Sequence, residues 1–138
     1  MIPQHAEIRK AVTSTRISGG EHEYTIWGIK ALLDAGAVDI LQPDPTWCGG
    51  ITELTRICAL ASAHAVPVVP HFGWVATAHV IQSPPQTTCP LQEWLIQPGA
   101  KSQALHRHKL GPVNGELAVP DTPGRGIALD EDVITSRE

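Results

Sequence analysis

The sequence is poor in cysteine and in long apolar runs, and each shortage removes a class of protein. The three cysteines, Cys48, Cys58 and Cys89, are odd in number and form no Cys-x-x-Cys pair. This argues against a zinc site and against a disulfide framework, and it favours reduced thiols. No apolar stretch approaches the roughly 18 residues that span a membrane, and the start MIPQHAEIRK has no apolar signal-peptide core. We therefore expect a cytoplasmic protein.

Positive charge is also scarce. Lys and Arg number 10 against 14 Asp and Glu, which gives a formal net charge of -4. This balance argues against electrostatic binding to nucleic acid or to a membrane surface. The glycine pairs at 19–20 and 49–50 are followed by no GxGxxG pattern and no Walker lysine, so tight turns are favoured over phosphate cradles. Hydrophobic residues make up 42% of the 138 positions, which is enough for a domain with its own core.

Short apolar runs alternate with helical patterns over the first two thirds of the chain. Strands are expected at residues 15–20, 38–44 and 66–71, with "QEWLI" at 92–96 as a candidate final strand, and helices at 4–13, 24–36, 51–65 and 75–82. Continuously apolar strands separated by helices are typical of a parallel sheet covered on its faces. The sequence therefore predicts an α/β architecture, followed by a tail broken by proline and glycine.

Two of these helices carry specific expectations. In the 24–36 pattern, Thr25 is a candidate N-cap and Gly36 follows the helix end. The 51–65 helix has an apolar face expected to be buried, made of Ile51, Leu54, Ile57, Cys58 and Ala61. Its polar face, expected to point away from the core, has Glu53, Arg56 and His64.

Each predicted strand ends at, or lies beside, an ionisable residue: Glu21, Asp44, His71 and Glu93. These residues are 22 to 27 positions apart, which is about the length of one strand-helix unit in a (β/α)8 barrel. Parallel strands point the same way, so the four side chains are expected to meet at the carboxyl-terminal rim, where barrel enzymes place their active sites. The alternative is that they are solvated strand ends, because polar residues often mark the end of a strand.

The four residue types also suit one chemistry. A carboxylate beside an imidazole orients it and supports proton transfer, so Asp44 and His71 are a candidate pair on adjacent strands. Glu21 is a hard oxygen ligand suited to Mg²⁺, although one carboxylate is not a complete site.

At these residues the sequence resembles the mandelate racemase branch of the enolase superfamily, and within it the L-rhamnonate dehydratase group of sugar-acid dehydratases. The stretches that carry the resemblance are "SGGEHEYT", "DILQPDPTWCGGITE", "VPVVPHFG" and "CPLQEWLI". It implies that residues 1–98 form the second half of a TIM-type (β/α) barrel, with strands equivalent to five to eight. Residues 99–138 would be a tail that packs on a capping domain. Both the capping domain and strands one to four would be absent from this sequence.

The resemblance also implies roles. Glu21 would be one of three carboxylates holding Mg²⁺, His71 the general acid/base, Asp44 its dyad partner, and Glu93 a hydrogen-bonding group for an enediolate. The reaction would remove the proton α to the carboxylate of an aldonic acid and then eliminate the β-hydroxyl. His22 and Trp47 are candidate substrate contacts, with an exposed loop residue and a packing residue as the alternatives.

Three hypotheses follow for the chain. The first is the catalytic part of a Mg-dependent acid-sugar dehydratase, and the isolated chain is expected to be inactive. The expected partners are a missing N-terminal half or further copies of the chain in a homo-oligomer. The second is an inactive half-barrel that associates through open strand edges. The third is a small α/β binding module unrelated to catalysis.

Overall fold

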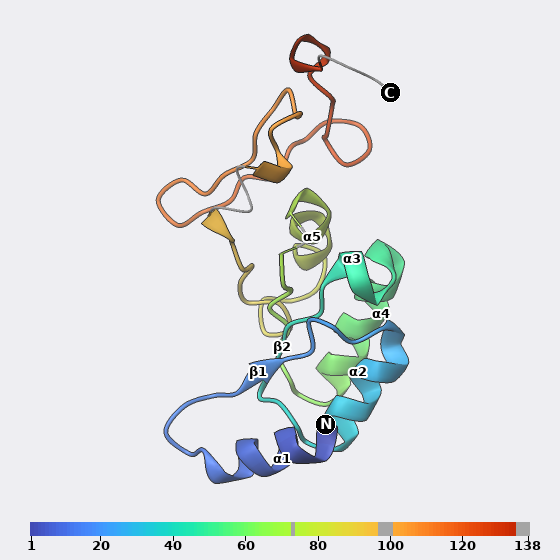
Figure 1. The fold of residues 1–138 in the computed structure, drawn as a ribbon, viewed down its shortest axis with the longest axis vertical. Coiled ribbons are helices and arrows are strands. Elements are labelled where there is room, and N and C mark those ends of the chain that lie inside the picture. The colour runs from blue at the N-terminus through green and yellow to red at the C-terminus, as the bar shows by residue number, and fades with distance from the viewer. Residues whose placement is uncertain (73, 97–100, 135–138) are drawn as a thin grey trace.

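Helices and very short strands alternate along the chain in the computed structural model, which describes residues 1–72, 74–96 and 101–134 (Figure 1). The elements are α1 (Ile2–Ala11), β1 (Ser18–Gly19), α2 (Thr25–Asp34), β2 (Ile40–Leu41), α3 (Pro45–Cys48), α4 (Gly50–Ala63), α5 (Trp74–Ile81) and the 3-10 helix η1 (Glu131–Val133). The mixed α/β order predicted from the sequence is confirmed.

Parallel pairing organises the strand positions. β1 pairs with β2 in the register Ser18 with Ile40 and Gly19 with Leu41, and Leu41 also forms a parallel bridge with Val68. The next segment joins because the Val68 amide donates to the carbonyl of Thr88 at 2.8 Å. Four successive segments therefore lie side by side in chain order, which is the arrangement of part of a β/α barrel.

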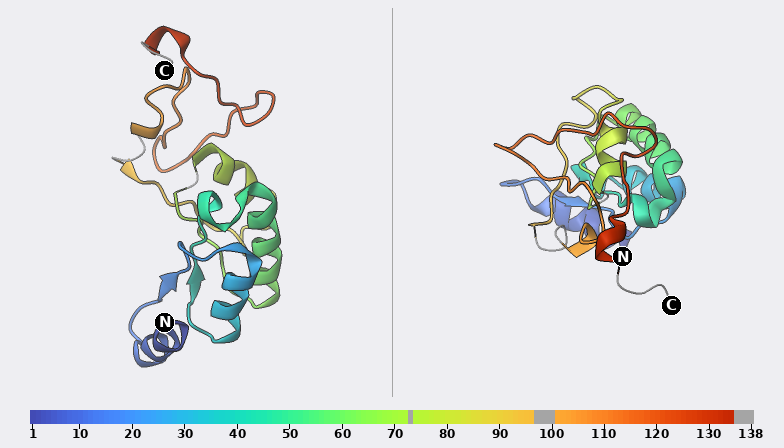
Figure 2. Two further views of the ribbon diagram at one scale, coloured as in Figure 1. Left: turned by 45° about the vertical axis from the view of Figure 1, so that its right-hand side comes forward. Right: turned by 90° about the horizontal axis from the view of Figure 1, so that it is seen from above.

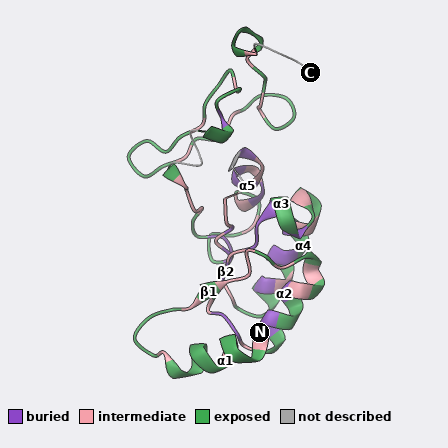
Figure 3. Ribbon diagram, viewed as in Figure 1, coloured by how far each residue is buried: buried purple, intermediate pink, exposed green. Residues whose placement is uncertain are grey.

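The core lies between these segments and helices α2 and α4, as the buried stretches of Figure 3 show. Ile29 of α2, Leu54 and Ile57 of α4, and Leu41 and Val68 of the sheet have no exposed surface. Full burial of one such side chain stabilises the fold by about 1.5–3 kcal/mol. The helices thus fix the face of the sheet, while its strand ends stay free to form a rim.

Helix α2 begins differently from the sequence expectation. Its N-cap is Tyr24, and Thr25 is its first residue. The Ile26 amide donates to Oε1 of Glu53 in α4 at 2.7 Å, so an acidic side chain from another helix satisfies this helix start. The other end is as predicted: Gly36 has φ +58°, and the amides of Gly36 and Ala37 donate to Leu33 and Leu32.

The predicted faces of α4 need two corrections. Leu54, Ile57, Cys58 and Ala61 are buried as expected, but Ile51 in its first turn is 41% exposed. Glu53 does not point away from the core: its side chain is only 14% exposed because it reaches back to α2. Helical periodicity assigned Glu53 to the outer face, and the unsatisfied amide of a neighbouring helix drew it inward.

The candidate strand at 92–96 is also wrong, because residues 92–95 lie in irregular structure and Ile96 is helical. The backbone that pairs with Val68 comes earlier, at Thr88, directly before Cys89 and Pro90. Proline removes the amide that would continue the ladder, which explains why pairing stops before "QEWLI" begins.

The tail from residue 101 to 134 lies beyond α5, at the opposite end of the molecule from α1 (Figures 1 and 2). Its described structure consists of η1 and isolated bridges between His106 and Leu129 and between Val113 and Glu116. The predicted domain boundary at 98/99 lies outside the described residues. The packing of the tail on a capping domain stays a prediction.

The described segments include no helix with both the length and the hydropathy required to cross a bilayer.

Asp39, just before β2, ties three parts of the chain together. Its Oδ2 accepts a hydrogen bond from the Ile17 amide at 2.9 Å, and its Oδ1 lies 2.8 Å from Nε of Arg9 in α1. The Ile17 hydrogen bond, followed by the Arg9 guanidinium, lowers the pKa of Asp39 below its ordinary value of 3.8. The folded state therefore favours the charged carboxylate.

We predict that Asp39→Asn destabilises the chain in a pH-dependent way. Because the folded-state pKa is lowered, this contribution is present above pH 3.8 and is lost as the pH falls through the folded-state value. Urea unfolding should show a lower midpoint for the variant at neutral pH, and the gap should close in acid. The exposed Asp121→Asn is the control. An Asp39→Asn deficit of equal size at every pH would contradict the prediction.

Candidate active site

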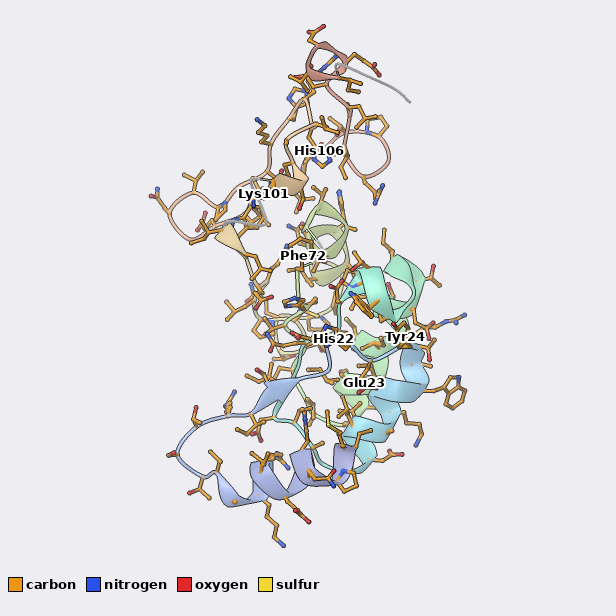
Figure 4. All side chains as sticks on the ribbon, viewed as in Figure 1. His22, Glu23, Tyr24, Phe72, Lys101 and His106 are labelled. Carbon is orange, nitrogen blue, oxygen red and sulfur yellow. The ribbon has the colours of Figure 1, made fainter. Side chains whose placement is uncertain are left out.

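The parallel pairing brings the ends of three strand segments together. The Gln42 amide donates to the Gly19 carbonyl at 2.9 Å, and the His71 amide donates to the Pro43 carbonyl at 3.1 Å. Both hydrogen bonds lie at the carboxyl ends of the paired segments. At these positions or within two residues after them, the chain carries Glu21, Asp44 and His71, as the sequence predicted. Figure 4 labels His22 and Phe72, their immediate neighbours, in the region between the strands and α5.

Glu21 reaches the rim through a tight turn. Gly20 has φ +108°, and a Cβ there would lie 3.3 Å from Leu32 Cδ1, so only glycine fits without strain. The Glu23 amide donates back to the Gly20 carbonyl at 3.2 Å. The Glu21 side chain is 44% exposed, with one oxygen 3.7 Å from His22 Nδ1 and the other 3.7 Å from His71 Nδ1.

His71 is the centre of the site. Its side chain is 25% exposed, and Nδ1 lies 2.5 Å from Glu93 Oε2 in addition to the Glu21 contact. Nδ1 is buried and makes no directional hydrogen bond, so the contact with Glu93 is a close approach of the two groups. Two carboxylates therefore stand beside Nδ1 of a half-buried imidazole, an arrangement that balances the positive charge of the ring when it is protonated.

Glu93 has a second contact that the sequence did not indicate. The same Oε2 accepts from the Phe72 amide at 3.3 Å. Phe72 has φ +53°, in the left-handed region that non-glycine residues rarely adopt. Glu93 thus touches both the imidazole and the turn after it, although it lies outside any strand.

Asp44 lies at the end of its segment but uses its carboxylate locally. The side chain is the N-cap of α3: Oδ1 accepts from the Thr46 amide at 2.7 Å and from the Thr46 hydroxyl at 2.6 Å. The residue is 5% exposed. Its dyad with His71 stays a prediction, because the contacts described for His71 Nδ1 are to Glu21 and Glu93. The sequence "DPT" carried this capping signal, an aspartate followed by proline at the first helical position.

An aromatic group borders the site. The rings of His22 and Trp47 meet edge to face at 5.0 Å, and Tyr24 meets Trp47 at 5.5 Å. Tyr24 is 60% exposed and Trp47 is 44% exposed, so this wall faces outward. The two candidate substrate contacts, His22 and Trp47, are thus adjacent to each other, and His22 is also adjacent to Glu21. Tyr24 is the third ring of this group. Its position three residues after Glu21 is the only sequence feature that indicates a place near the site.

The described residues do not form a complete metal site. They contain no group of three or more His, Cys, Asp or Glu side chains placed to hold a metal ion. Mg²⁺ prefers octahedral oxygen coordination, and Glu21 is the more exposed of the two carboxylates beside His71.

Comparison with known proteins agrees with this fold. The model of the family described as "Enolase C-terminal domain-like" matches residues 1–133.

The chain belongs to the enolase C-terminal domain-like family.

The proteins that this chain is similar to include sugar-acid enzymes. L-Rhamnonate dehydratase from Saccharopolyspora erythraea is 39% identical over 96% of this chain, and the match covers 35% of that protein. The structure of L-talarate dehydratase from Polaromonas sp., complexed with Mg and L-glucarate, is 25% identical, has a TM-score of 0.80, and is matched over 96% of this chain and 35% of its own. The 3,6-anhydro-D-galactonate cycloisomerase from Zobellia galactanivorans is 36% identical over 94% of this chain and 38% of its own, with a TM-score of 0.76.

The chain therefore spans about a third of the length of these relatives. The rim formed by Glu21, His71 and Glu93 lies within the residues that the family model matches.

Proposed function

We propose that this chain supplies the proton-transfer rim of a sugar-acid dehydratase, a hydro-lyase acting on an aldonic acid. The observation that carries the proposal is the half-buried His71 imidazole with the carboxylates of Glu21 and Glu93 beside Nδ1. Membership in the enolase C-terminal domain-like family and the similarity to two named dehydratases support the reaction class.

In the proposed step, the second ring nitrogen of His71 takes the proton from the carbon α to the substrate carboxylate. The electrons of that C–H bond move toward the carboxylate and give an enediolate. They return to break the bond to the β-hydroxyl, which leaves as water with the proton that His71 has taken, and the enol that remains tautomerises to a 2-keto-3-deoxy acid. The carboxylates near Nδ1 offset the positive charge that the imidazole acquires.

The other residues would serve this step by binding and positioning. Glu93 would hold the turn at Phe72 and hydrogen-bond the enediolate, and Asp44 would pair with His71 if α3 releases its carboxylate in the complete protein. His22 and Trp47 would contact the hydroxyl-bearing chain of the substrate. Each role follows from position at the rim and from the resemblance of the motifs.

Glu21 is the proposed Mg²⁺ ligand in the complete protein. The relatives crystallised with Mg make a divalent cation the expected cofactor. The described residues offer this one carboxylate and do not complete a coordination shell. For the 138-residue chain by itself we therefore expect no turnover.

A chimera tests the proposal. Residues 1–133 replace the matching third of the L-rhamnonate dehydratase from Saccharopolyspora erythraea, and the product is assayed on a panel of aldonic acids. We predict that His71→Asn in this chimera lowers kcat by about 10²–10⁴-fold, the usual contribution of a general base. Circular dichroism checks that the variant keeps its fold.

The matched control is His64→Asn, at the exposed C-cap of α4, which should leave turnover unchanged. A His71→Asn chimera that turns over as fast as its parent would remove His71 from the chemistry and with it the proposed function.

A second candidate is a half-barrel that associates with other chains. β1 is an edge strand of the described sheet, and several large apolar side chains are exposed, including Trp27 at 74% and Leu91 at 66%. Unpaired edges and exposed apolar surface both favour contact with another chain.

We predict that the isolated chain has a concentration-dependent mass above its 14.8 kDa monomer in light scattering. Trp27→Glu should shift the mass toward the monomer by placing a charge on the contact surface. Thr13→Glu, in the exposed loop before β1, should not. A monomer at all concentrations would rule out the associating half-barrel.

A further inference from the structure

Two of the three cysteines meet in the core. Sγ of Cys58, in the middle of α4, lies 3.6 Å from Sγ of Cys89, in the segment that follows α5. Both residues are buried, with 3% and 5% of their surface exposed. Cys48 is also buried, and none of the three is in a disulfide. The pair is separated by 31 positions in sequence, so the fold itself creates the contact.

The neighbourhood allows the two sulfurs to come closer. A disulfide requires a sulfur separation of about 2.05 Å, so side-chain rotation would have to take up roughly 1.5 Å. The partners are a helix and a loop segment, and a loop can follow such a movement. The Thr88 carbonyl, one residue before Cys89, is held by the Val68 amide, which keeps the segment aligned beside α4.

Small molecules have a route to both sulfurs. A pocket of about 230 Å³ is lined by Cys58 together with Ser62 and Thr88. A second pocket of about 750 Å³ is lined by residues that include Cys89 and Ala78. A peroxide is only slightly larger than water and fits such spaces.

We propose that Cys58 and Cys89 are an oxidation site at which a peroxide forms an intramolecular disulfide. The bond would cross-link α4 to the segment after α5 and enclose a loop that contains Val68, His71 and α5. It would thereby fix the strand segment that delivers His71 to the rim. This inference is independent of the proposed dehydratase function, because it depends on the two sulfurs alone.

The chemistry balances with a peroxide as the oxidant. The sulfur of Cys89 attacks one peroxide oxygen, the O–O bond breaks, and a sulfenic acid forms as the first water leaves. The sulfur of Cys58 then attacks the Cys89 sulfur, the S–O bond breaks, and the second water leaves with the remaining thiol proton. The two thiols lose two electrons and the peroxide gains them.

The order of attack follows from the contact between the sulfurs. The hydrogen bond with Cys58 lowers the pKa of Cys89, and the same contact raises the pKa of Cys58. Burial raises the pKa of Cys48 to about 11, so Cys89 is the one of the three thiols whose pKa is lowered, and it is the one that attacks the peroxide.

The positions of lysine and arginine allow trypsin to separate the cysteine pair from Cys48. There is no Lys or Arg between Arg56 and Lys101, so trypsin leaves Cys58 and Cys89 in one peptide, residues 57–101. Cys48 falls in a different peptide, residues 31–56. The folded wild-type chain is treated with hydrogen peroxide, unfolded, alkylated with iodoacetamide, digested, and measured by mass spectrometry.

We expect the 57–101 peptide to lose both alkylation sites and the mass of two hydrogens, while Cys48 remains alkylated. Dithiothreitol before alkylation should restore both sites. Two alkylated cysteines after oxidation, sulfinic acid without a cross-link, or a link to the 31–56 peptide would each overturn the proposal.

The same oxidation in denaturant is the control for the role of the fold. In an unfolded chain the 10-residue separation of Cys48 and Cys58 favours that pair about fivefold over the 31-residue separation of Cys58 and Cys89. Folding should reverse this preference. Equal product ratios in the folded and unfolded chain would contradict the proposal. Cys48→Ala should keep the folded-state cross-link, and Cys89→Ala should abolish it.

Discussion

Backbone hydrogen bonding between parallel segments is the constraint on which this structure depends. The Leu41 amide donates to the Pro67 carbonyl, and the Leu41 carbonyl accepts from the Val69 amide. Both backbone groups of this fully buried residue are therefore hydrogen-bonded to the next segment. A slip of one residue would turn Leu41 out of the core and move the following polar residues off the rim. Burial of Leu41 therefore sets the register, and the register sets where Glu21 and His71 stand.

The chemistry of the site comes from the turns and loops at the ends of the strands. Tight turns at Gly20 and Phe72 carry the chain off the sheet directly before Glu21 and directly after His71. Glu93 arrives from an irregular segment and contacts both the imidazole and the Phe72 amide. The rim thus combines positions dictated by regular pairing with one position dictated by side-chain attraction.

The α/β order, the helices and the convergence at the rim could be predicted because they depend on periodicity and on parallel direction. Other features could not be. Glu53 satisfies the start of α2 from another helix, a partnership between residues 27 positions apart that a local pattern does not encode. Asp44 shows the reverse case. The local pattern "DPT" is enough to predict its helix cap with Thr46, but the family resemblance led to the expectation of a dyad with His71 instead. "QEWLI" has strand composition, yet Pro90 stops the pairing before it.

The most direct test of the account is a double-mutant cycle between His71 and Glu93, measured as the free energy of unfolding of wild type, His71→Asn, Glu93→Gln and the double variant. Side chains in contact couple by about 0.5 kcal/mol or more. We predict such a coupling for this pair and none for the parallel cycle of His71 with Asp44→Asn in the isolated chain. Additive effects of the His71 and Glu93 changes would mean that the rim does not bring these side chains together.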